Sequence, residues 1–311
     1  SVQLKNTLDQ LSADIGSGRI SWGELTKKGS VAFAQEVSNI SKSSFSNMEQ
    51  NFHEYSGLIY DGAFSEHITS KEKRGLTGDN IDEQKAQEIA KKFIGEDKVQ
   101  EITSTGKSEN TNMPTFDFSV KVNGETNSNM VISISEKGGH VVFMNYNRDI
   151  QAESVTQERA DEIGKDFLKS RGFDDMKETY YLKQDGIVTI NYAYEQDGVT
   201  VYPDLIKLKV ALDNGEIMGI ETTGYLNSHE KRNISDVKIT KEQAKKDLNS
   251  KIEILSENLA IIPTEWKTEV LCWEFKGKVD DTDFLVYINA KTGEEQDILV
   301  ITNTPNGTLT H

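Results

Sequence analysis

Hydrophobic positions follow one kind of spacing before residue 80 and another after it. Apolar residues recur every three or four positions over residues 2–15 and again over 22–55, which is the spacing of one face of a helix. Ser21 and Glu24 form an S-x-x-E capping box at the start of the second stretch. Two helices that pack only against each other cannot bury both of these apolar faces completely. We therefore predict a helical region that is half of a bundle or a docking face for a partner helix.

Beyond residue 80 the chain repeats a helix start three times. Each copy has an aliphatic residue, an Asp or Thr at the N-cap, a polar first turn and an inward Ala: residues 81–86, 155–160 and 239–244. The starts at Ile81, Val155 and Ile239 are separated by two stretches of similar length. Such a period predicts tandem copies of one structural unit.

Each helix start is followed by runs in which apolar and polar residues alternate, which predicts strands. The clearest runs are 115–122, 130–134, 188–194, 205–212, 270–275 and 284–288. Each copy closes with a glycine turn, at 136–139, 213–215 and 291–293. We predict an α+β fold in which each unit is one helix packed on an antiparallel four-stranded sheet. The predicted segments are a helical region (1–56), a connecting motif (57–79), three repeats (80–150, 153–228 and 236–303) and a tail (304–311).

Charge and composition narrow the possible partners. The formal net charge is -16, from 35 Lys and Arg against 51 Asp and Glu. An acidic surface repels phosphate backbones and anionic lipid, so we expect no nucleic-acid partner. It would attract a basic partner, although solubility alone explains the same charge. The single cysteine, Cys272, excludes an intramolecular disulfide and a cysteine-rich zinc site.

No apolar run reaches the length of a membrane-spanning helix. The sequence begins at Ser1, within a helical pattern and without a methionine. We therefore expect a fragment of a longer protein, in which a missing N-terminal segment could carry a membrane anchor.

The third repeat is the nearest match to the PepSY domain family. It has Ile-Thr-Lys-Glu-Gln-Ala at 239–244 and Asn-Ala-Lys-Thr-Gly-Glu at 289–294; the second repeat keeps Asp-Asn-Gly-Glu at 213–216, and the first departs at Gly139-His140. The whole chain resembles a family of spore germination proteins that have an anchor, a helical region, a connecting motif and PepSY repeats. The sharpest likeness is the connecting stretch Tyr-Ser-Gly-Leu-Ile-Tyr-Asp-Gly-Ala-Phe-Ser-Glu-His at 55–67.

This resemblance implies a non-catalytic regulatory protein outside the inner membrane of a spore, in the cortex region. Its expected partner is the cortex-lytic hydrolase SleB, which it would stabilise and restrain. PepSY modules more generally resemble peptidase-inhibitory or peptide-binding units, which leaves a generic inhibitor module as an alternative.

Two groups of residues are candidates for partner binding. The first is in the connecting motif, where apolar and charged residues alternate: Leu58, Ile59, Tyr60, Asp61, Phe64, Glu66 and His67. This stretch is either an interaction loop, a carboxylate and histidine site, or a buried connector that docks the helices onto the first repeat. The second group is Tyr192 and Tyr194 in the tyrosine-dense second repeat, which either pack against neighbouring repeats or bind a partner.

Signals for catalysis are weak along the whole sequence. The five histidines show no metal-binding spacing, and neither a G-x-S-x-G elbow nor a P-loop occurs. Cys272 lies between Leu271 and Trp273 in a strand pattern, which predicts a buried core thiol. We predict no catalytic residue, metal site or cofactor. The enzymatic alternative is a peptidoglycan hydrolase that uses carboxylates near Asp61 and Glu66.

Overall fold

The computed structural model describes Phe64 and residues 73–109, 111–125, 128–246, 248, 251–264, 268–304 and 307–310. All of them belong to one compact unit, Tyr60–His311. The helical region predicted over 1–56 lies outside the described residues. None of the described helices is long and apolar enough to cross a membrane.

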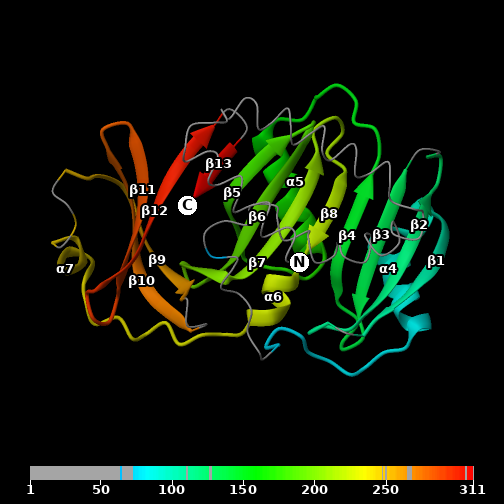
Figure 1. Ribbon diagram of the computed structural model, residues 1–311, viewed down its shortest axis with the longest axis horizontal. Coiled ribbons are helices and arrows are strands. Elements are labelled where there is room, and N and C mark those ends of the chain that lie inside the picture. The colour runs from blue at the N-terminus through cyan, green and yellow to red at the C-terminus, as the bar shows by residue number, and fades with distance from the viewer. Residues whose placement is uncertain are drawn as a thin grey trace, which may run out of the picture. The chain divides into compact units, whose positions relative to one another are not determined.

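Three sets of elements follow one another, each with a helix before four strands (Figure 1). The first set is α4 (Glu83–Ile94), η3 (Glu96–Lys98), β1 (Val99–Ser108), β2 (Thr115–Val122), β3 (Asn129–Ser135) and β4 (Val141–Asn147). The second is α5 (Gln157–Ser170), β5 (Met176–Gln184), β6 (Ile187–Gln196), β7 (Val199–Ala211) and β8 (Ile217–Glu221). The short α6 (Thr223–Ser228) comes next. The third set is α7 (Lys241–Lys245), β9 (Glu253–Pro263), β10 (Glu269–Val279), β11 (Thr282–Asn289) and β12 (Glu295–Thr304), and β13 (Gly307–Thr310) follows it. The fold is α+β, as predicted, and the described elements are mostly β-strands.

The three predicted helix starts are confirmed. Asp82, Thr156 and Thr240 each precede a helix, and their side chains accept a hydrogen bond from the backbone N–H three residues later. Each cap satisfies a donor that the first turn of a helix leaves without a partner. The third helix, α7, has only five residues, against 12 in α4 and 14 in α5.

The aliphatic residue before each cap contacts the closing turn of its own set. The backbone N–H groups of Ile81, Val155 and Ile239 donate to Glu136, Leu212 and Ala290 at 2.8, 2.9 and 2.9 Å. The turn glycine that follows has φ of 67° at Gly139, 79° at Gly215 and 82° at Gly293, which favours glycine. The start of the helix and the end of the sheet are therefore joined in every set, which explains why the two motifs recur together.

The sets are hydrogen-bonded edge to edge, which the sequence analysis did not predict. Within each set the strands pair antiparallel in chain order, and β4 pairs with β8, β5 with β13 and β7 with β9. The result is one 13-stranded sheet in the order β1-β2-β3-β4-β8-β7-β6-β5-β13-β12-β11-β10-β9. Where β4 meets β8, a Cβ on Gly219 would lie 3.0 Å from the carbonyl oxygen of Met144, so a glycine permits the close approach.

The first two sets share one hydrophobic core, so they are not two separate units of one helix on one sheet. Buried residues of α4, of α5 and of the strands beneath both helices form a single cluster. The two helices also contact each other, because the rings of Phe93 and Phe167 meet edge to face at 5.7 Å. The guanidinium of Arg171 lies over both rings and donates to the Phe93 carbonyl oxygen at 2.9 Å. These sets are therefore coupled by packing as well as by the sheet.

Strands of the second and third sets close into a ring. Because β7 pairs in parallel with β9, hydrogen bonding runs without a break through β5, β6, β7, β9, β10, β11, β12 and β13. We call these eight strands the closed ring. One face of β10 contributes Phe275 to a cluster with Ala244 of α7, and the other contributes Cys272 to a separate cluster. That second cluster, the ring interior, comprises Phe64, Tyr202, Ala260, Ile262, Cys272, Tyr287 and Leu299.

Candidate functional site

Most of the predicted interaction loop lies outside the described residues: Leu58, Ile59, Tyr60, Asp61, Glu66 and His67. Phe64 is described and is only 6% exposed. Its ring lies 5.2 Å from that of Tyr202 on β7 and 5.3 Å from that of Tyr287 on β11. The burial expected of a buried connector is confirmed for Phe64, but docking onto the first repeat is wrong for this residue, because its aromatic partners are in the second and third sets.

Tyr192 is a core residue, so its predicted contact with a partner is wrong. It is 0% exposed, and its hydroxyl donates to Asp161 of α5 at 3.0 Å. A Cβ on Gly164 would collide with that hydroxyl, so the glycine lets the helix lie directly over the ring. Burial and the nearby Asp161 carboxylate both raise the pKa of Tyr192. The alternating strand pattern did not distinguish the helix-covered face of the sheet from the other face.

Tyr194 is half-buried and packs within the chain. Its ring meets the imidazole of His229 edge to face at 4.8 Å. The ring of Tyr225 stacks on the same imidazole at 4.0 Å. Contacts within the chain therefore cover part of the Tyr194 ring, and binding of a partner by this residue stays a prediction.

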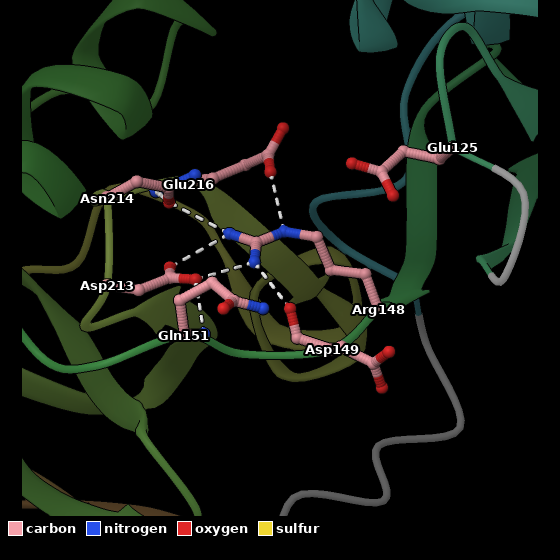
Figure 2. A pocket seen from close by; sticks show the side chains of 7 residues that line it. All are labelled: Glu125, Arg148, Asp149, Gln151, Asp213, Asn214 and Glu216. Carbon is pink, nitrogen blue, oxygen red and sulfur yellow. Dashed lines mark hydrogen bonds and ion pairs between the residues drawn. The ribbon is translucent and has the colours of Figure 1, made fainter.

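A pocket of about 520 Å³ opens at the junction of the first and second sets (Figure 2). Its lining residues are Glu125, Arg148, Asp149, Gln151, Asp213, Asn214 and Glu216. Arg148 donates to both carboxylate oxygens of Asp213 at 2.7 and 2.9 Å, and to Glu216 at 3.0 Å. Figure 2 shows Glu125 across the pocket from Asp213, in the first set.

Charge pairing fixes the ionisation of these pocket residues. Hydrogen bonds from Arg148 lower the pKa of Asp213 to about 2, and those to Asp213 raise the pKa of Arg148. Burial alone would raise the pKa of Glu216, but Lys98 and Arg148 outweigh it and lower the value. Arg148 is thus paired with carboxylates of its own chain, and the other lining side chains are the carboxylates of Glu125 and Asp149 and the neutral amides of Gln151 and Asn214.

A second ion cluster joins the second set to the third. Arg232, in the segment between them, binds both carboxylate oxygens of Asp204 on β7 at 2.7 Å and both of Glu269 on β10 at 2.8 Å. Asp204 is 0% exposed and also contacts His229 Nδ1 at 2.7 Å. Arg74 extends the cluster through Glu230 at 2.6 Å. The cluster fixes the joint between the sets, because removal of one partner would leave a buried charge uncompensated.

A third polar group lies in the ring interior. Glu274 of β10 is 7% exposed and accepts hydrogen bonds from the hydroxyls of Tyr202 at 2.6 Å and Tyr287 at 2.9 Å. Burial raises the pKa of both tyrosines. Cys272 is 0% exposed, as predicted for a core thiol, and burial raises its pKa to about 12.

Sequence reasoning missed the residues that hold these clusters. Arg148 and Arg232 lie in or beside the short segments that were left between predicted repeats, where periodicity carries no information. Within the described ranges, no group of three or more His, Cys, Asp or Glu side chains is arranged to hold a metal ion. The described clusters bind segments of the chain to one another.

Two sequence families match the chain. Residues 41–235 match the family described as "YpeB sporulation, PepSY1 and PepSY2 domains", and residues 238–299 match "Peptidase propeptide and YPEB domain". The sporulation protein YpeB of Bacillus subtilis (strain 168) is 33% identical over 267 residues, which are 84% of this chain and 58% of that protein. YpeB of Halalkalibacterium halodurans is 29% identical over 75% of this chain and 52% of its own length. The chain thus spans about half the length of the curated relatives it matches.

A solved structure supports the same assignment. The C-terminal domain of Bacillus megaterium YpeB matches with a TM-score of 0.66 and 28% identity, over 73% of this chain and 100% of the matched domain. The likeness expected from the connecting motif and the PepSY motifs is therefore confirmed. The chain belongs to the YpeB family of sporulation and germination proteins, whose members contain PepSY domains.

Proposed function

We propose that this chain is a non-catalytic regulatory protein that binds, stabilises and restrains the spore-cortex hydrolase SleB. In this proposal it acts outside the inner membrane of the spore, held by an anchor in a longer protein. Membership of the YpeB family is the observation that carries the proposal. The name of the second matched family, which includes peptidase propeptides, supports a module that acts on another protein.

The finer architecture is part of the proposal. We infer that the three sets of a helix and four strands are three copies of one PepSY unit, behind a helical region over 1–56. Their matching N-caps and glycine turns support common descent. The edge-to-edge pairing and the two arginine clusters support a single rigid scaffold that presents one continuous surface.

The acidic balance of the chain favours a basic partner. Lys98, Arg148 and Arg232 are paired with carboxylates of the same chain, whereas the formal net charge is -16. Association driven by this charge would weaken as salt screens it. The connecting motif supplies the specific contacts in this proposal, through Tyr60, Glu66 and His67.

The test is binding of the purified chain to SleB, with cortex peptidoglycan hydrolysis as the second readout. We expect a complex that elutes together, a slower hydrolysis rate when the chain is in excess, and a longer half-life of the hydrolase on warming. The variant Tyr60→Ala/His67→Ala should weaken binding at least tenfold. The matched control Asp280→Asn/Asp281→Asn changes an exposed hairpin tip and should bind normally. Absence of a complex at low salt would refute the proposal.

The enzymatic alternative is tested in the same preparation. Incubation of the chain alone with purified peptidoglycan should release no fragments. Fragments that disappear in Asp61→Asn or Glu66→Gln would establish a hydrolase instead. Inhibition of unrelated secreted proteases would favour a generic inhibitor module.

A further inference from the structure

Strands of the second and third sets supply most of the ring interior, and Phe64, which belongs to neither set, completes it. Tyr202 lies on β7 of the second set, and Tyr287 and Cys272 lie on β11 and β10 of the third set. Phe64 comes from a turn that precedes all of these strands, in the connecting motif. Its side chain nevertheless belongs to the same buried cluster. The cluster is therefore completed by a segment that is separate from the strands around it.

The rings of Tyr202 and Tyr287 receive the Phe64 ring through directional contacts. Phe64 meets Tyr287 edge to face at an interplanar angle of 76°, meets Tyr202 at 50°, and the two tyrosines meet each other at 88°. Tilted and edge-to-face pairs are the favourable geometries for aromatic rings. Glu274 fixes both tyrosines, because each hydroxyl donates to the same carboxylate oxygen. The two tyrosine rings are thus held by strands and by hydrogen bonds, without any contribution from Phe64.

We propose that the interior of the closed ring is a binding site for an aromatic side chain of a peptide segment, and that Phe64 is its ligand within this chain. The site recognises a phenyl ring that contacts two orthogonal tyrosine rings, whose hydroxyls are held by the buried carboxylate of Glu274. Occupancy by Phe64 has the advantage of covalent linkage, which gives a high effective concentration. A competing segment can occupy the site only after Phe64 leaves it. This site is independent of the proposed role with SleB.

Cys272 provides a reporter for the state of the site. It is the only cysteine of the sequence, is 0% exposed, and lies in the cluster with Phe64. In the full chain under native conditions, we expect a thiol reagent to label Phe64→Ala at least tenfold faster than the wild type. The variant Phe64→Leu keeps an apolar side chain and should lie between them. The matched control is Leu168→Ala, which removes a side chain of 0% exposure from the other large cluster.

The ligand is tested with a synthetic peptide of residues 55–67. Added to Phe64→Ala, it should slow the labelling of Cys272 at least fivefold, and the same peptide with alanine at position 64 should not. The wild-type chain, whose site is occupied, should show no effect of either peptide. Circular dichroism and urea unfolding of each variant separate opening of the site from global unfolding. If Phe64→Ala does not fold, Phe64→Val takes its place in both measurements.

Two results would overturn the proposal. The first is labelling of Phe64→Ala no faster than that of Leu168→Ala at equal unfolding free energy, because Phe64 would then be an ordinary core residue. The second is a peptide that gives no protection at millimolar concentration. Both measurements use the chain alone, so neither depends on whether it binds SleB.

Discussion

Arg148 and Asp213 form a bidentate ion pair across 65 residues of sequence, with N–O distances of 2.7 and 2.9 Å. Arg148 follows the last strand of the first set, and Asp213 opens the closing turn of the second. The side chains are 7% and 4% exposed. The pair therefore fixes the end of one set against the turn of the next, beside the backbone pairing of β4 with β8.

Removal of the guanidinium should destabilise the chain strongly. Arg148→Met leaves Asp213 and Glu216 without their shared cation, and breaking a buried pair from one side costs about 3–5 kcal/mol. Urea unfolding at neutral pH measures the loss. Arg148→Lys keeps the charge but not the two-pronged geometry, so its loss should be smaller. The double variant Arg148→Met/Asp213→Asn should lose less than Arg148→Met alone, and an equal or larger loss would contradict this account.

The same pair predicts a dependence of stability on acid. Hydrogen bonds from Arg148 lower the pKa of Asp213 from 3.8 to about 2 in the folded chain. A lowered pKa contributes stability above the unfolded value, and that contribution is lost as pH falls through the folded value. Wild type should therefore exceed Asp213→Asn in unfolding free energy at pH 5, and the difference should shrink between about pH 4 and pH 2. A difference that stays constant over this window would contradict the assignment.

The sequence predicted the structural features that depend only on residues close together along the chain. Asp82, Thr156 and Thr240 cap their helices because an N-cap acts over three residues, and the turn glycines adopt the left-handed φ that their position requires. It did not predict how the sets join, because the contacts are remote. Tyr202 and Tyr287 contact Phe64 from the second and third sets, with the whole first set between them along the chain.

The candidate site was predictable to a smaller degree than the fold. Phe64 stood out as an apolar residue in a mixed loop, but the residues that receive it lie in ordinary strand patterns. Tyr192 and Tyr194 are two positions apart on β6, so alternation places them on one face without saying what covers it. Burial under α5 decides the role of Tyr192, and only the position of the helix reveals it.

Gly215, the glycine in the closing turn of the second set, tests how closely that turn contacts the helix α5 of the same set. Gly215 has φ of 79°, and a Cβ there would lie 2.6 Å from Ile163 Cδ1 on α5. Gly215→Ala should therefore incur the left-handed backbone cost, about 1–2 kcal/mol, and a smaller steric cost of about 1 kcal/mol or less, because Ile163 Cδ1 ends a flexible, half-buried side chain that can move aside. Gly172→Ala is the control, because its φ is 83° but no atom lies within 4 Å of the added Cβ.

Urea unfolding of these two variants separates the costs. Gly172→Ala should lose only the backbone part, and Gly215→Ala should lose more. Ile163→Val on the Gly215→Ala background should recover part of the difference, because it removes the methyl group that the new Cβ approaches. Equal losses for the two glycine variants would show that the contact with α5 does not constrain the turn.

The carboxylate of Glu178 on β5 should lower the free energy of unfolding at neutral pH. Burial and the nearby Asp161 carboxylate raise the pKa of Glu178, and the charge of Lys165 and a hydrogen bond from Gln157 at 3.0 Å partly offset this rise. A raised pKa contributes stability that is fully present below the unfolded value and is lost as pH rises through the folded value. Glu178→Gln should therefore be more stable than wild type at pH 7, by about 0.5 kcal/mol because solvent screens a half-buried group. The gain should vanish below about pH 4, where the glutamate is protonated in both states. Thermal or urea unfolding at pH 4 and pH 7 measures it, and a wild type that is more stable than Glu178→Gln at pH 7 would mean that Gln157 and Lys165 compensate the buried charge fully.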